Sequence, residues 1–280
     1  MSLLRILFTR LRTEEKLLKD AADRCGIPCE LQNVSDTFFG GAPFCSEDDV
    51  VLARCVSHNM NEAVAHVLEA QGIRVVNPSS VMTLCGNKLA TSTALEAAGV
   101  PQPKFLTAFT PEGALEAAET LGYPVVCKPI SGSWGRLLAK VNDRESAEAV
   151  FEHKAMLGAI HNTFYIQEFV DKGAFDVRAF VVNGEPLCAI SRTSAHWITN
   201  TARGGTAANM PIDEEVASLL RTTHKAVGGG EFLAVDLFKS NGRWLVNEVN
   251  DGGEFRNSIA PTETDIPGAV VTAAWEARKK

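Results

Sequence analysis

The sequence predicts an α/β fold in which an open parallel sheet is followed by smaller α+β lobes. Over residues 4–77, apolar segments of strand length alternate with segments of helical spacing, and this βαβ rhythm is typical of a Rossmann-like parallel sheet. Later in the chain, Asn183-Gly184 and Asn241-Gly242 are hairpin signals, which predict mostly antiparallel β-structure there. A length of 280 residues accommodates two domains, or one large domain with a lid.

Periodicity and capping residues predict the elements of the first part. Thr13–Cys25 has helical spacing, with Thr13 as candidate N-cap and Gly26 as C-cap. A second helix is expected at Asn61–Gln71. Neither the dinucleotide pattern G-x-G-x-x-G nor the phosphate-loop pattern G-x-x-x-x-G-K-[ST] occurs, so any nucleotide must be bound in another way. The strands of this part are expected at Leu4–Phe8, Pro28–Val34, Val50–Ala53 and Arg74–Asn77.

The rest of the chain mixes helices with strands. Thr110 followed by Pro111 fits an N-cap and a first helical position. Helices are expected at Asn87–Ala98, Thr110–Gly122, Arg144–Met156, Asp213–Val227 and Ile266–Lys279, and strands at Tyr123–Lys128, Leu137–Val141, Tyr165–Val170, Phe232–Phe238 and Trp244–Asn250.

Composition narrows the classes of partner. The net charge of -7 makes nucleic acid an unlikely main partner, because general polyanion binders are basic. No run of about 18 apolar residues occurs, so no membrane span is expected, and the apolar N-terminal stretch is too short for a signal peptide. The seven cysteines form no C-x-x-C pair and have no histidine at zinc-finger spacing. They are interpreted as reduced thiols, most of them buried, of a cytosolic protein.

A glycine-containing loop is the strongest local signal. Lys128 ends a predicted strand, and the small residues of the following loop, Pro129–Gly135, expose consecutive backbone N–H groups. Such a loop can surround phosphates while the lysine supplies positive charge. A flexible turn is the alternative interpretation, and the loop alone favours phosphate only slightly.

Acidic residues on a predicted hairpin suggest a cation site. Asp236 lies on one alternating strand, and Glu248 and Asn250 share a face of the next. Their oxygens suit Mg²⁺, which takes few protein ligands and completes its shell with phosphates. A two-residue turn at Asn241-Gly242 would put Glu248 on the face opposite Asp236, whereas a three-residue turn starting at Ser240 would bring them together. The metal hypothesis therefore predicts the three-residue turn, and a two-residue turn would contradict it. A solvated hairpin face is the weaker alternative.

On the preceding predicted hairpin, the loop length likewise decides whether two arginines share a face. A three-residue loop around Asn183-Gly184 would place Arg178 and Arg192 on one face, and a two-residue loop would separate them. Like charges on one face repel unless an anion lies between them, and a triphosphate, an acyl phosphate or a substrate carboxylate would serve. Two separate surface ion pairs are the alternative.

The polar segments between these elements offer loops but no catalytic triad. Thr199–Gly205 ends in glycines and contains Arg203, and it is a lid candidate together with Ser131–Arg136. His196 receives no catalytic role, because a lone histidine is more often structural. Ser133 lacks the G-x-S-x-G context of a serine nucleophile.

Seven segments together match a known family over nearly the full length of the chain. Ser194–Gly205 is the longest and most specific of them, and the others are Gly86–Lys88, Lys128–Leu138, Tyr165–Glu168, Asp176–Arg178, Val235–Phe238 and Val246–Asn250. On these segments the sequence resembles the ATP-grasp superfamily, in its RimK-type branch. It is most similar to the ligases LysX and ArgX, which act on the amino-group carrier protein LysW.

The resemblance implies roles for individual residues. Nucleotide binding falls to Lys88, Lys128, Ser133, Trp134, Gly135, Gln167, Glu168, Phe169, Val170 and Asp176. Magnesium, expected as two ions, would be held by Asp236, Glu248 and Asn250. The phosphates and the reacting carboxyl would be held by Arg178, Arg192, Asn200 and Arg203. The amine substrate would contact Asp251, Gly252, Gly253, Glu254, Asn257 and Ser258.

The implied fold is an ATP-grasp fold with an N-terminal Rossmann-like pre-ATP-grasp domain. Its expected domains are residues 1–86, a central lobe at 87–167 and a C-terminal lobe at 168–280. The implied reaction is ATP-dependent amide formation. A carboxylate of a small acidic carrier of the LysW type becomes an acyl phosphate, and the amine of an amino acid then displaces phosphate. A cytoplasmic homodimer or homotetramer is also implied.

Three alternatives remain open at this stage. The favoured amine is α-aminoadipate, because Glu254–Ser258 resembles that type of ligase, yet Asp251-Gly252-Gly253 departs from it and leaves glutamate open. A RimK-like protein glutamate ligase or small peptide ligase would share the ATP site. A non-catalytic nucleotide-binding module ranks last, because the predicted metal ligands are all present.

Overall fold

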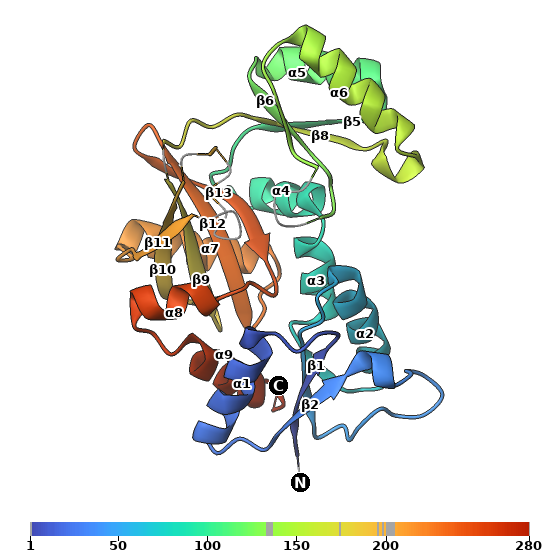
Figure 1. The fold of residues 1–280 in the computed structure, drawn as a ribbon, viewed down its shortest axis with the longest axis vertical. Helices are drawn as coiled ribbons and strands as arrows, with labels where there is room; N and C mark the ends of the chain where they lie inside the picture. The colour runs from blue at the N-terminus through green and yellow to red at the C-terminus, as the bar shows by residue number, and fades with distance from the viewer. Residues whose placement is uncertain are drawn as a thin grey trace.

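The chain is seen in a computed structural model that describes residues 2–132, 137–173, 175–194, 196, 197, 199 and 205–279, without the side chain of Ile160 (Figure 1). Within these residues the strands form three four- or five-stranded sheets. The molecule is elongated, with the N-terminal sheet at one end and the middle sheet at the other (Figure 1). None of the described helices is long and apolar enough to cross a membrane.

The N-terminal sheet confirms the predicted βαβ pattern. Its strands pair in the order β2-β1-β3-β4, and every pairing is parallel. The first helix begins one residue earlier than the predicted N-cap implies, because Arg12 rather than Thr13 is the N-cap. The Arg12 backbone N–H donates to Glu15. The elements are β1 (Leu4–Phe8), α1 (Thr13–Arg24), β2 (Cys29–Asn33), η1 (Val34–Asp36), β3 (Val50–Ala53), α2 (His58–Ala70), β4 (Arg74–Val76) and α3 (Ser79–Cys85).

The middle sheet is antiparallel, with strand order β5-β8-β6-β7. Two helices pack on the sheet and enclose a small core that contains Phe151 and Phe164. The first of these two helices, α5, has Thr110 as its N-cap, and the Thr110 hydroxyl accepts from Gly113 N as the capping rule predicts. The elements are α4 (Lys88–Ala97), β5 (Phe105–Ala108), α5 (Pro111–Leu121), β6 (Val125–Lys128), β7 (Ala139–Val141), α6 (Arg144–Met156), η2 (Ala159–His161) and β8 (Phe164–Glu168).

The third sheet is antiparallel, in the order β11-β10-β9-β12-β13. One face packs on α7, α3 and α4 through an apolar cluster that includes Val177, Val235 and Leu220. The strands β5 and β11 and the helices α3 and α8 are short and escaped the sequence interpretation. The elements are β9 (Phe175–Val182), β10 (Glu185–Thr193), β11 (Thr206–Asn209), α7 (Glu214–Ala226), β12 (Phe232–Ser240), β13 (Arg243–Asn250), α8 (Arg256–Thr262) and α9 (Ile266–Ala277).

The turn between β12 and β13 was predicted wrongly. Ser240 pairs with Arg243, so the turn has two residues, Asn241 and Gly242, both with positive φ, and not the expected three. The register then shifts between Leu237 and Asp236, because β13 has a β-bulge at Asn247. Asp236 therefore lies directly opposite Glu248, and the two acids share a face despite the short turn.

The hairpin of β9 and β10 repeats this arrangement. Val182 pairs with Glu185 across a two-residue turn, and a bulge between Pro186 and Cys188 shifts the register. Beyond the bulge, Ile190 pairs with Arg178 and Arg192 pairs with Asp176. The three-residue loop expected here was also wrong, but the bulge places Arg178 and Arg192 on one face.

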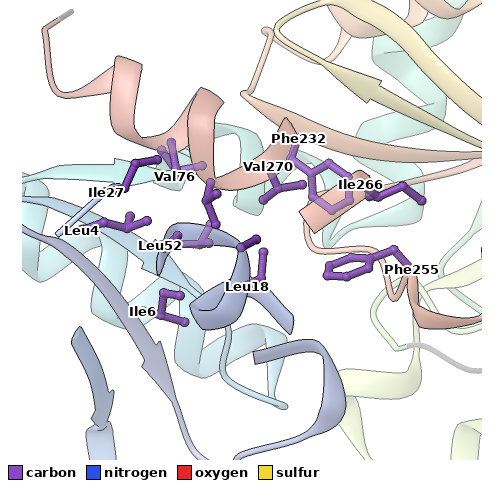
Figure 2. Close-up of a cluster of buried hydrophobic side chains, with 14 of the residues drawn as sticks. Leu4, Ile6, Leu18, Ile27, Leu52, Val76, Phe232, Phe255, Ile266 and Val270 are labelled. Atoms are coloured by element: carbon purple, nitrogen blue, oxygen red, sulfur yellow. The ribbon is translucent and has the colours of Figure 1, made fainter. Parts of the chain in front are cut away.

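The N-terminal sheet and the C-terminal helix share one core (Figure 2). Leu4, Ile6 and Leu52 of the sheet belong to a buried cluster with Ile266 and Val270 of α9. Phe232 and Phe255 extend this cluster to the third sheet, with their rings edge to face at 6.1 Å. The core thus fixes the carboxyl edge of the N-terminal sheet against the segment that follows β13.

Candidate active site

One cavity gathers all the sequence-predicted site residues that the structure describes. It lies where the middle sheet, the third sheet and the carboxyl edge of the N-terminal sheet meet. The predicted Ser133, Trp134, Gly135, Asn200 and Arg203 lie outside the described residues. The predicted residues that line the cavity are Lys88, Lys128, Gln167, Glu168, Phe169, Val170, Asp176, Arg178, Arg192, Asp236, Glu248, Asn250, Asp251, Gly252, Gly253, Glu254, Asn257 and Ser258.

Two lysines reach the cavity from different elements. Lys88 begins α4, and its Nζ donates to Gly132 O at 2.7 Å and lies 3.0 Å from Glu248 Oε1. Lys128 ends β6, and its Nζ donates to Asn247 Oδ1 at 3.0 Å. Because Asn247 is the bulge residue and Glu248 follows it, the bulge gives each lysine its own partner on β13. Burial of Lys128 lowers its pKa to about 8, although Glu248 acts in the opposite direction.

The anion between the two predicted arginines is a carboxylate of the protein itself. Asp236 accepts two hydrogen bonds from Arg178, from Nε and Nη2, both at 2.8 Å. Its Oδ2 also lies 3.2 Å from Arg192 Nη2. Burial opposes ionisation of Asp236, but Arg178 and Arg192 outweigh burial and lower its pKa to about 2. The carboxylate therefore stays charged between the two guanidinium groups.

A second carboxylate extends this network. Asp176 accepts from Arg192 Nε at 2.7 Å and from Lys172 Nζ at 3.0 Å, and the hydroxyl of Thr199 also donates to it. Lys172 in turn donates to Thr199 at 2.5 Å. Burial lowers the pKa of Lys172, against the opposing effect of Asp176. The network holds the cations of the third sheet in place before any ligand arrives.

The donor set fits a hard divalent cation. Asp236, Glu248 and Asn250 supply two carboxylates and an amide from the paired strands β12 and β13, and all three line the cavity. Within the described residues, no three His, Cys, Asp or Glu side chains are close enough to hold a metal ion alone. A cation here would need ligands from a bound phosphate, which is the coordination that Mg²⁺ prefers. The Asn250 Nδ2 atom is buried and has no hydrogen-bond partner.

The end of β8 forms another wall of the cavity. Gln167 is buried and donates through Nε2 to the hydroxyl of Tyr165. The Glu168 carboxylate accepts from Lys104 N at 2.8 Å, which fixes its side chain. Phe169 lies below Lys140, whose Nζ is 3.6 Å from the ring centroid. Backbone and side chains here present both apolar surface and hydrogen-bonding groups to the cavity.

The segment after β13 is held by two residues that follow β3 of the N-terminal sheet. Gly252 O accepts from Arg54 Nη1 at 2.9 Å, and Asp251 Oδ1 lies 3.4 Å from His58 Nδ1. A Cβ atom at Gly253 would lie 2.3 Å from the Ala234 Cβ, so only glycine fits against β12 there. The segment Asp251-Gly252-Gly253 departs from the aminoadipate type of ligase, and at Gly253 the close packing against Ala234 explains the glycine.

Several cavity residues were missed by the sequence interpretation. Arg12 and Arg54 follow β1 and β3, and the parallel pairing of these strands could have drawn attention to both. Asn247 sits beside a predicted ligand, but its contact with Lys128 depends on a bulge that no residue pattern announced. Nothing in the local sequence marks Lys172.

Comparison with known proteins gives consistent likenesses over the whole chain. The RimK-like ATP-grasp domain matches residues 85–273, and the LysX preATP-grasp domain matches residues 4–84. The chain is 34% identical to the α-aminoadipate–LysW ligase LysX of Sulfurisphaera tokodaii, covering 99% of this chain and 100% of the relative. It is 32% identical to the glutamate–LysW ligase ArgX of the same organism, covering 93% and 94%.

Solved structures agree with these likenesses. A RimK domain ATP-grasp protein from Sphaerobacter thermophilus has a TM-score of 0.80 at 25% identity, covering 96% of this chain and 98% of that one. D-alanine–D-alanine ligase from Bacillus anthracis, complexed with ATP, has a TM-score of 0.72 at 15% identity, covering 100% and 99%, and shares the fold.

Fold, cavity and relatives together define an ATP-dependent ligase that forms a carbon–nitrogen bond. The chain belongs to the RimK-like ATP-grasp family. ATP-grasp ligases use ATP together with divalent metal ions, and the cavity described above holds cationic and carboxylate side chains suited to both.

Proposed function

We propose that this ligase joins the amino group of α-aminoadipate to the side-chain carboxyl of the C-terminal glutamate of a LysW-type carrier protein. The observation that carries the proposal is that lysine and arginine side chains suited to phosphate line the same cavity as the segment 251–258. Relatives named LysX, at 34–35% identity, support the carrier and the amine. The small acidic carrier would bring its tail to a cavity rich in lysine and arginine.

In the proposed reaction, a carrier carboxylate oxygen attacks the γ-phosphorus of ATP, which forms an acyl phosphate and releases ADP. The amine nitrogen then attacks the carbonyl carbon, phosphate leaves, and the nitrogen gives up a proton. Lys88 and Lys128 would bind the ATP phosphates, and Arg178 and Arg192 would neutralise charge on the phosphoryl group and on the reacting carboxyl. No side-chain nucleophile is needed, because positioning and charge neutralisation supply the catalysis.

The remaining roles follow from the same proposal. Gln167–Val170 would meet adenine, and Asp251–Ser258 would line the amine pocket. Mg²⁺, expected as two ions held by Asp236, Glu248 and Asn250, would neutralise phosphate charge when bound. We also propose boundaries after residues 86 and 167, a homodimer or homotetramer, and a cytoplasmic location.

Carrier modification provides the direct test. Purified enzyme, ATP, Mg²⁺ and LysW are incubated with either α-aminoadipate or glutamate, and the carrier mass is measured. The proposal expects an ATP-dependent gain equal to aminoadipate minus water, with one ADP released per transfer. Reactions without ATP or without amino acid are the controls. No gain with either amino acid would refute the carrier function.

Glutamate is the second candidate, because ArgX relatives at 29–32% identity cover about the same length. A mass gain with glutamate alone would replace the first proposal with this one, and gain with both would indicate dual specificity. Transfer of glutamate to a protein other than LysW, with no transfer to LysW, would favour a RimK-like protein glutamate ligase.

Affinity for ATP should fall as the pH rises through about 8, because Lys128 loses its proton there. Burial disfavours the ammonium form, so Lys128 is mostly charged at pH 7 and becomes neutral above its lowered pKa. The uncharged amine no longer offsets phosphate charge, and we expect about tenfold weaker ATP binding from about pH 7 to 9.

Calorimetric titration of ATP across that range checks this expectation. Lys128→Arg is the matched variant, because guanidinium keeps its charge and should remove most of the decline. Wild-type affinity that stays constant through pH 8 would contradict the proposed contact of Lys128 with phosphate.

A further inference from the structure

Arg54 is a buried cation whose hydrogen bonds are incomplete. Its side chain is 3% exposed and lines the cavity. One nitrogen, Nη1, donates to Gly252 O, while Nε and Nη2 have no hydrogen-bond acceptor. A buried guanidinium normally satisfies all its donors, because each unpaired donor keeps its full desolvation cost. Two unused donors on one buried arginine therefore call for a missing acceptor.

The neighbouring acids do not supply that acceptor. Glu15 Oε1 lies 3.5 Å from Arg54 Nε, but Glu15 is already engaged by Arg12 through Nε at 3.1 Å and Nη2 at 2.7 Å. Glu14 is buried and its Oε1 lies 3.7 Å from Arg256 Nε. Glu254 faces Arg12 at 3.6 Å. Burial lowers the pKa of Arg54 in spite of Glu15 and Glu14, so its charge is only partly compensated.

The position of Arg54 in the sheet is that of a ligand-binding residue. In the order β2-β1-β3-β4, the chain crosses from β1 outward to β2 and then returns to β3 on the other side. Ligands of open parallel sheets bind outside the carboxyl ends of the strands at such a switch point. Arg54 directly follows β3, and Arg12 follows β1 across that crevice. Both residues line the cavity that also holds the segment 251–258.

We infer that Arg54 binds the side-chain carboxylate of the acceptor amino acid, so that the N-terminal sheet selects an amino acid with a second carboxylate. This inference rests on the proposed function only for the choice of an amino acid as ligand. The acceptor nitrogen must react beside β12 and β13, and the carboxylate next to that nitrogen stays with those strands. The far end of the side chain then extends toward the N-terminal sheet, where the planar guanidinium offers two donors to a carboxylate.

Direct binding to the whole enzyme tests the inference without the carrier. Calorimetry in the presence of Mg²⁺ and a non-hydrolysable ATP analogue compares glutamate with glutamine, and aminoadipate with its side-chain amide. Each pair differs in the terminal carboxylate alone. We expect the acid to bind about 100-fold more tightly than the amide in the wild type, because an unmatched buried charge discriminates strongly.

A cycle of variant and ligand separates recognition from a structural role. In Arg54→Gln the acid and the amide should bind within about threefold of each other, whereas Arg54→Lys should keep part of the preference. Exposed Arg10, changed to Gln, is the matched control and should keep the wild-type ratio. Affinity for the ATP analogue should be the same in all variants. If Arg54 were merely structural, Arg54→Gln would weaken the acid and the amide equally.

Each outcome bears on one claim. If the wild type binds the acid and the amide with nearly equal affinity, the inference is overturned, even if Arg54→Gln fails to fold. The same equal affinities are expected if the carboxylate bound by Arg54 belongs to the carrier. A preference that survives in folded Arg54→Gln overturns it as well. If the wild type prefers the acid strongly and Arg54→Gln loses that preference, but no amino acid is transferred to LysW, the inference is upheld and the carrier function is refuted.

Discussion

Glu248→Ala should lower turnover by about a thousandfold while the protein stays folded. The proposal makes this carboxylate a magnesium ligand, so its loss removes charge stabilisation from the phosphoryl transfer. The same side chain does little for stability. It is partly exposed, its contact is Lys88, and Lys88 keeps its bond to Gly132 O when Glu248 is absent. We therefore expect the free energy of unfolding to change by less than about 0.5 kcal/mol.

Steady-state ADP release measures the turnover, and urea unfolding measures the stability. Glu185→Ala is the matched control, because Glu185 is an exposed acid of the same sheet that pairs with Arg221 at 2.9 Å. It should leave both quantities near the wild-type values. Turnover in Glu248→Ala within tenfold of the wild type would remove Glu248 from the metal site.

The chain organisation was predictable because it follows local patterns. The parallel sheet came from apolar strands that alternate with capped helices, as at Leu4–Phe8 and Thr13–Arg24. The start of α5 at Thr110 followed from one hydroxyl and one proline. Such features depend on residues a few positions apart, so a single sequence contains them.

The registers of the two hairpins show where pattern reasoning reached its limit. The dipeptides Asn183-Gly184 and Asn241-Gly242 predict turns, and in the structure each dipeptide forms a two-residue turn. The expected three-residue loops were inferred from the chemistry instead, because the acids and arginines had to share a face. The bulges at Asn247 and beside Pro186 achieve the same result. The position of a bulge depends on packing between strands, and no local residue pattern in either hairpin predicts it.

The charged partners were still harder to predict. Two like charges at Arg178 and Arg192 were expected to need an anion from a ligand, but Asp236 already pairs with both, and Asp176 also pairs with Arg192. The place of Arg54 after β3 could have drawn attention to it, but its hydrogen bond to Gly252, which is distant in sequence, could not be predicted from any local pattern. Contacts of this kind exist only after the sheets have packed.

Asp236→Asn should destabilise the protein by about 3 kcal/mol, in contrast to Glu248→Ala. Asp236 is 5% exposed and binds Arg178 twice and Arg192 once. The amide keeps the shape but removes the charge, and one of its two ends can no longer accept a hydrogen bond. The buried Arg192 then keeps its ion pair with Asp176, whereas the partly buried Arg178 loses its ion pair with Asp236. Turnover should fall as well, because the same carboxylate is a proposed metal ligand.

The pH dependence of this loss identifies its electrostatic origin. The two arginines depress the pKa of Asp236 to about 2, below its unfolded value of 3.8, so its charge stabilises the fold above pH 3.8. That contribution is lost as the pH falls through the folded pKa. Urea unfolding of wild type and Asp236→Asn should therefore differ most near neutral pH and converge as the pH approaches about 2. An equal difference at every pH would mean that Asp236→Asn acts through packing, and that the ion network contributes nothing to stability.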